Sequence, residues 1–156
     1  MATENMMNQA KMVYTKLIQT LENIGWHYRE AGDLSVTYTV TGDDLPMEFV
    51  VTIDANLLAI RFASILPVKF SEEKRLDGII AACAASNGLK EGIFSCRESD
   101  GTILFISASP FIDCEVGEGW FRTMMSFAHG TVDQFNDKFL MLSKGLIDIN
   151  KFVAEA

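Results

Sequence analysis

Two histidines, three cysteines and an acidic run are the residues of this 156-residue sequence that could do chemistry. His27 and His129 lie far apart in the chain, and neither belongs to an HExxH pattern. A zinc site would need one of them to converge with cysteines. Nucleophilic catalysis would need a Ser or Cys held beside a base, but the sequence contains neither a GxSxG elbow nor a cysteine-protease signature. These residue types therefore predict no catalytic set, no metal site and no bound cofactor, and we expect that the protein is not an enzyme.

The acidic run extends from Glu98 to Phe121 and contains no Lys or Arg. Its last three acids are Asp113, Glu115 and Glu118. Paired carboxylates can do acid–base work or bind Ca²⁺ or Mg²⁺, and a hydrolase would need at least two of them to converge in a cleft. The spacing only faintly suggests a calcium-binding loop. We interpret the run as a solvated acidic loop, with a docking surface for a basic partner as the alternative.

The three cysteines, Cys83, Cys96 and Cys114, form an odd-numbered set without CxxC spacing. This pattern favours reduced thiols in the core of a cytosolic protein. The chain has no signal-peptide pattern at its start, and its longest uncharged stretch is too short to span a bilayer. We therefore expect a cytoplasmic protein.

The formal net charge of −8 limits the classes of partner. Nucleic-acid binding depends on Lys and Arg that neutralise phosphates, and anionic membranes attract basic surfaces for the same reason. The charge therefore argues against nucleic-acid and membrane partners.

The elements that must position these residues can be predicted from hydrophobic spacing. Apolar residues recur at three- and four-residue steps from Met6 to Ile24 and predict a helix that ends at Gly25. A short extended piece begins at Trp26, and alternating residues then predict strands over 34–41, 47–53 and 57–65. The close spacing of these strands leaves no room for a crossover helix, so we expect a meander.

The second half predicts a helix, a hairpin and a long final helix. Ser71 is a candidate N-cap for the middle helix. We expect its buried stripe to consist of four residues: Leu76, Ile79, Ile80 and Cys83. Strands at 93–96 and 102–109 would flank a turn, and an apolar stripe from Trp120 onward predicts a helix that ends at Gly145. His129-Gly130 interrupts this stripe, so we expect a kink or two helices with a tight joint. The order of elements indicates an α+β fold with about five strands, and the length indicates a single domain over residues 1–156.

Six methionines lie on the two terminal helices: Met6, Met7, Met12, Met124, Met125 and Met141. Methionine adapts to irregular surfaces and is common in promiscuous binding sites. We interpret these residues as core or homodimer interface, with an adaptable surface for a client protein as the alternative.

Several short segments occur in a characteristic order along the chain. The longest of them are the stretch Ala85–Phe94 and the hairpin Asp100–Phe105. The flanking segments are Gly25-Trp26, Thr52-Ile53-Asp54, Leu66-Pro67-Val68 and Thr131–Phe135. Taken in this order, the segments resemble those of the bacterial YbjN family. The resemblance covers nearly the whole chain, from about Leu17 to Gly145.

This resemblance implies a fold similar to that of type III secretion chaperones, with a twisted antiparallel sheet flanked by N-terminal, middle and C-terminal helices. Such proteins are often dimeric, and members of the family are described as regulators of sensory transduction or stress, with no enzymatic activity attached. We therefore expect a non-catalytic protein-binding module, chaperone-like or regulatory, that acts as a homodimer and binds a protein client.

For the dimer interface we expect Phe121, Met124, Met125 and Met141, so that Met125→Glu would give a soluble monomer. The alternative function is a small-molecule- or metal-responsive sensor. Its pocket would lie between the sheet and the last helix, with Trp26, Trp120 and Phe127 as lining residues.

Overall fold

The computed structural model describes all residues from 1 to 156 and shows an α+β fold with one six-stranded antiparallel sheet. The elements in chain order are α1 (Glu4–Ile24), β1 (Tyr28–Glu30), β2 (Ser35–Thr41), β3 (Pro46–Asp54), β4 (Ala59–Lys69), the 3₁₀ turn η1 (Glu72–Lys74), α2 (Arg75–Ser86), β5 (Ile93–Cys96), β6 (Thr102–Pro110), α3 (Glu118–Lys144) and α4 (Ile149–Ala154). The predicted fold class is confirmed, and the short extended piece after α1 forms the additional strand, β1.

The strand order across the sheet is β1-β2-β3-β4-β6-β5. The first four strands form the predicted meander, and the β5–β6 hairpin joins it through β6, which pairs with β4. Phe62 at the centre of the sheet faces Val51 of β3 on one side and Ser107 of β6 on the other. This pairing brings two halves of the chain, separated in sequence by α2, into one sheet.

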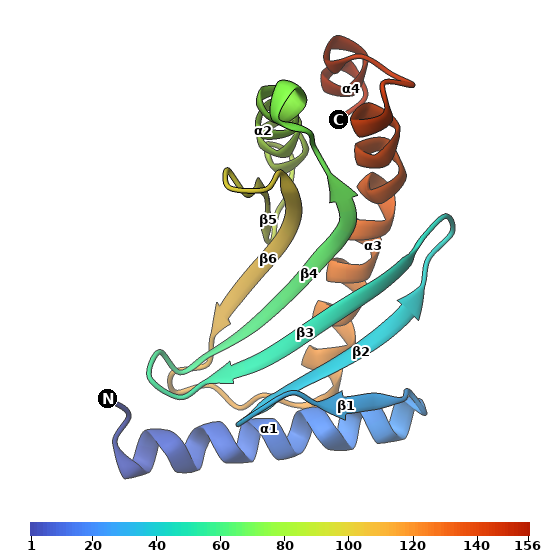
Figure 1. Ribbon diagram of the computed structural model, residues 1–156. Coiled ribbons are helices and arrows are strands. Elements are labelled where there is room, and N and C mark those ends of the chain that lie inside the picture. The colour runs from blue at the N-terminus through green and yellow to red at the C-terminus, as the bar shows by residue number, and fades with distance from the viewer.

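The helices are distributed unevenly around the sheet. Figure 1 shows α3 running along one face, α1 crossing one end of the sheet near β1, and α2 with α4 at the opposite end. The strands alternate between buried and more exposed side chains, as expected when only one face is covered by a helix. The two ends of the molecule are therefore formed by different helices, α1 and α2.

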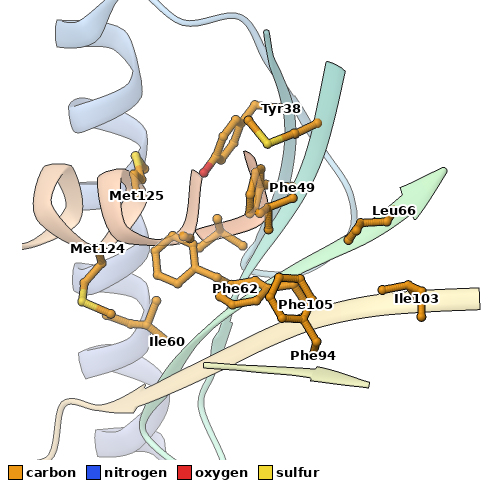
Figure 2. Close-up of a cluster of buried hydrophobic side chains, with 14 of the residues drawn as sticks. Tyr38, Phe49, Ile60, Phe62, Leu66, Phe94, Ile103, Phe105, Met124 and Met125 are labelled. Carbon is orange, nitrogen blue, oxygen red and sulfur yellow. The ribbon is translucent and has the colours of Figure 1, made fainter. Parts of the chain in front are cut away.

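The core lies between the sheet and α3 and is rich in phenylalanine. In Figure 2, Phe49, Phe62 and Phe105 of the sheet lie with Met124 and Met125 of α3 in one cluster of buried side chains. Further along α3, the rings of Phe135 and Phe139 contact Phe94 of β5 with centroid distances of 5.5 and 5.2 Å. The apolar side of α3 is thus used to cover the sheet.

The predicted C-terminal ends of α1 and α3 agree with the structure. The Thr3 hydroxyl accepts a hydrogen bond from the Met6 N–H at 3.3 Å, and Gly25 ends α1 with a φ of 79°. Gly145 ends α3 in the same left-handed conformation, with a φ of 74°. The alternative of two helices that meet at His129-Gly130 is wrong, because α3 is one uninterrupted helix of 27 residues.

The prediction for the buried face of α2 is wrong. The face that packs against the protein consists of small residues, namely Gly78, Ala81, Ala82 and Ala85. The exposed face holds the apolar residues that we expected in the core, namely Leu76, Ile79, Ile80 and Cys83. Gly78 explains the choice of face, because a Cβ atom there would lie 2.8 Å from the Phe70 ring, so only glycine allows the helix to approach this closely.

The prediction that the cysteines are core thiols is also wrong for two of the three. Cys83 lies on the exposed face of α2, Cys114 is exposed in the loop after β6, and only Cys96 is partly buried. Burial raises the pKa of the Cys96 thiol, which therefore stays protonated at neutral pH. The three thiols are free, but they are not core residues as a set.

None of the helices combines the length and the apolar character that crossing a membrane requires.

Candidate functional site

The interface residues predicted on α3 lie mainly inside the protein. Phe121, Met124 and Met125 are 0%, 9% and 1% exposed, and Met141 is half-buried. Because α3 is the helix that covers the sheet, its apolar stripe packs against the chain's own strands (Figure 2). Glu at position 125 would therefore place a charge in the core and destabilise the fold, instead of giving a soluble monomer.

The outer face of α2 is an exposed apolar surface. Leu76, Ile79 and Ile80 are 66%, 42% and 40% exposed, and they lie at helical spacing on one side of the helix. Beside them, Ile93 of β5 is 56% exposed, and a shallow groove of about 510 Å³ lies between α2 and β5. We call these four residues with Cys83 the α2 stripe. Neighbouring exposed apolar side chains of this kind are a common feature of interaction surfaces.

At Phe94, the edge of the sheet beside this stripe is hydrogen-bonded to α2. Phe94 faces Phe105 of β6 on one side, and its backbone N–H on the other side donates to Ser86 Oγ at 2.8 Å. The Phe94 carbonyl lies 3.2 Å from the same hydroxyl. Because α2 thus satisfies the backbone groups at this position of the edge, a partner at the stripe would pack on the helix and would not extend the sheet.

A second surface lies at the other end of the molecule, where α1 meets the acidic loop. A groove of about 480 Å³ runs between α1 and residues 111–116. Its apolar lining includes the buried residues Val13 and Phe111 and the 67% exposed Met12, and Asp113 and Glu115 add their carboxylates. The structure therefore places two of the three predicted acidic-loop residues in one groove.

The third predicted acid, Glu118, has a structural role. Its carboxylate accepts a hydrogen bond from Asn23 at 2.7 Å and pairs with Arg122 at 2.7 Å. The hydrogen bond from Asn23, followed by that from Arg122, holds the pKa of Glu118 below its usual value. Glu118 thus links the start of α3 to the C-terminal end of α1 and does not line the groove.

The acidic side chains do not form a metal site. No group of three or more His, Cys, Asp or Glu side chains lies close enough to bind a metal ion. Asp113 and Glu115 take part in none of the four ion pairs of the protein. The chemistry available at this groove is therefore attraction of a positive charge beside an apolar surface.

The residues predicted for a sensor pocket have different surroundings. Trp26 packs against Tyr38 and His129, whereas Trp120 packs against Phe62 and Phe121. Phe127 is 56% exposed. The arrangement of these three aromatic residues gives no support to a common ligand pocket.

His129 has an environment that the sequence did not indicate. Its ring lies among Trp26, Tyr38 and Phe49, and its Nε2 atom is 3.0 Å from the Tyr38 hydroxyl. Burial lowers the pKa of His129 to about 4, so the ring is neutral at pH 7. The side chain therefore belongs to the aromatic packing between α3 and the meander.

Comparisons with known proteins were made at the level of sequence and of structure. No family model and no curated protein matches the sequence. Among solved structures, the chain is similar to YbjN from E. coli, a candidate transcription regulator, with a TM-score of 0.59 and 10% identity over 83% of this chain and 90% of that chain. It is also similar to a chain of the HopA1–SchA chaperone–effector complex, with a TM-score of 0.55 and 9% identity over 82% of this chain and 95% of that chain.

The chain therefore has a YbjN-like fold that is shared with a chain of a chaperone–effector complex. The predicted resemblance is confirmed at the level of the fold. At these identities, the similarity concerns the backbone arrangement, and the functional argument depends on this chain's own surfaces.

Proposed function

We propose that this protein is a non-catalytic protein-binding module, chaperone-like or regulatory, that acts as a homodimer through the α2 stripe. The observation that carries the proposal is the orientation of α2, which packs its glycine and alanines inward and leaves Leu76, Ile79 and Ile80 exposed. Burial of apolar surface is the main favourable term in protein association. A chain that leaves such a stripe exposed is stabilised by a partner that covers it.

A second copy of the chain fits this surface. In a two-fold dimer the same patch is used twice, so a helix packs against its own symmetry mate. If two α2 helices lie antiparallel and cross near Ile79 and Ile80, Leu76 of one copy lies near Cys83 of the other. The apolar residues of both stripes then cover each other.

The helix dipoles favour the antiparallel arrangement, because it places the N-terminal end of one α2 beside the C-terminal end of the other. The charged side chains at the two ends do not distinguish the arrangements, since Glu72 and Glu73 are followed by Lys74 and Arg75, and Lys90 is followed by Glu91.

The known structures of similar fold support a protein-binding role. One is a chain of a chaperone–effector complex, and the other is a candidate transcription regulator. We propose that this chain likewise binds a protein client or regulates a partner, in a stress or sensory-transduction response.

Light scattering coupled to size-exclusion chromatography tests the dimer. We expect the wild-type protein to show twice the 17.3 kDa mass of one chain. The double variant Leu76→Glu/Ile80→Glu should show the mass of one chain with an unchanged circular dichroism spectrum, because both side chains are exposed in the single copy. Leu57→Glu/Leu146→Glu is the matched control, since Leu57 and Leu146 are 63% and 74% exposed outside the stripe, and it should keep the mass of a dimer.

A wild-type mass of one chain at all concentrations would contradict the proposed dimer. A stripe variant that stays dimeric would show that the copies associate through another surface.

A further inference from the structure

The groove between α1 and the acidic loop is separate from the α2 stripe. Figure 1 shows α1 at one end of the sheet and α2 at the other. A dimer through α2 would therefore leave this groove uncovered. The groove has an apolar floor, formed by the buried side chains of Val13 and Phe111, and an exposed apolar rim residue, Met12.

The two sides of the groove differ in charge. On the loop side, Asp113 and Glu115 are exposed and unpaired. On the α1 side, Lys16 is the one cation of the lining, and its Nζ atom donates to Gln19 Oε1 at 3.1 Å. The loop carries no compensating cation, because the sequence from Glu98 to Phe121 lacks Lys and Arg. A ligand in the groove therefore meets an apolar floor beside an excess of negative charge.

We propose that this groove binds a segment of a protein partner in which an apolar side chain lies next to Lys or Arg. The apolar side chain packs on Val13, Phe111 and Met12, and the cationic group pairs with Asp113 or Glu115. The proposal rests on the proposed protein-binding function, and it names the chemistry of the client segment. An acidic segment would meet two unpaired carboxylates and is disfavoured.

Charge makes the proposal testable without a known client. Two short fluorescein-labelled peptides share a central leucine, which is flanked by arginines in one peptide and by glutamates in the other. Fluorescence anisotropy at low salt should show that the wild-type protein binds the arginine peptide about tenfold more tightly, since two exposed ion pairs each contribute modestly. High salt should reduce this difference.

Variants on the two sides of the groove test whether the peptides bind there. Asp113→Lys/Glu115→Lys should reverse the preference between the two peptides. Asp33→Lys/Asp44→Lys, which makes the same change in net charge at exposed turns of the meander, should keep the wild-type preference. Met12→Ser should weaken binding of the arginine peptide severalfold, and Met7→Ser, also exposed on α1 but outside the groove, should not.

Three results would overturn the proposal: equal affinity for both peptides, no binding of either, or a loop variant that behaves like the turn variant. Measuring the oligomeric mass of the same samples distinguishes failure of the proposed groove from failure of the proposed dimer. A wild-type dimer that shows no peptide preference would contradict the proposed binding groove but not the dimer. A monomeric wild-type protein that prefers the arginine peptide would contradict the dimer but not the groove.

Discussion

At the scale of single residues, His129 is a partly buried ionisable group with a predictable effect on stability. It is surrounded by aromatic rings and shares a hydrogen bond with Tyr38, whose own pKa is raised by burial. Burial disfavours the imidazolium, and this desolvation is what lowers the pKa of His129 to about 4. In the unfolded chain the same ring has a pKa of about 6.5.

This difference predicts how stability depends on pH. Between about 6.5 and 4 the unfolded chain binds more protons than the folded one, so the contribution of His129 is complete above pH 6.5 and is lost as the pH falls toward 4. Down to pH 4.5 the loss is roughly 2 kcal/mol. Urea unfolding at pH 7 and pH 4.5 should show that His129→Gln loses less stability than the wild-type protein. Equal losses in both proteins would show that the ring does not titrate in this way.

At the scale of elements, the close approach of α2 to the sheet depends on a glycine. A Cβ atom at position 78 would lie 2.8 Å from ring atoms of Phe70, which is 1% exposed, and 3.1 Å from the Cys96 sulfur. Gly130 in α3 is the opposite case, because a Cβ atom there meets nothing within 4 Å. Gly78 and Gly130 therefore have different reasons to be present.

Alanine at the two positions should have effects of opposite sign. Gly130→Ala should raise the free energy of unfolding by up to about 1 kcal/mol, the usual gain for alanine in a helix interior. Gly78→Ala should lower it by about 1 to 3 kcal/mol, because overpacking against Phe70 outweighs that gain. Chemical denaturation of both variants measures the two changes. A stabilised Gly78→Ala protein would contradict the close packing of α2.

The same helix shows how far the sequence could predict the structure. Apolar spacing located the helices, the meander and the hairpin, because these patterns follow from local geometry. Apolar spacing does not indicate which face of α2 is buried, since Leu76-Ile79-Ile80 and Gly78-Ala81-Ala82 repeat with the same period. The choice depends on Phe70 and Cys96, which come from other elements.

The sequence likewise predicts the candidate sites only in part. The acidic loop could be recognised from its composition, and Asp113 and Glu115 do line a groove. Its other wall comes from α1, about a hundred residues earlier in the chain, so the groove itself could not be predicted. The sequence predicts the methionines of α3 at an interface, because a core stripe and an interface stripe have the same apolar pattern.

At the scale of the whole molecule, the sheet separates two surfaces with different chemical character. The α2 stripe lies at one end and is apolar, as a face for a second copy should be, and the α1 groove lies at the other end and combines an apolar floor with negative charge. In the proposed dimer each copy keeps its own groove, far from the two-fold axis. The dimer would then present two equivalent sites to its client.

This arrangement predicts that a single site does not depend on the dimer. Calorimetric titration with the arginine-flanked peptide should give two peptides per wild-type dimer and one per chain of the Leu76→Glu/Ile80→Glu monomer. The dissociation constant per site should agree within about twofold, because groove residues such as Val13 and Asp113 all come from one chain. A monomer that loses peptide affinity while it stays folded would show that the site is completed by the second copy. The client segment would then cross the dimer axis, and the two surfaces would form one binding face.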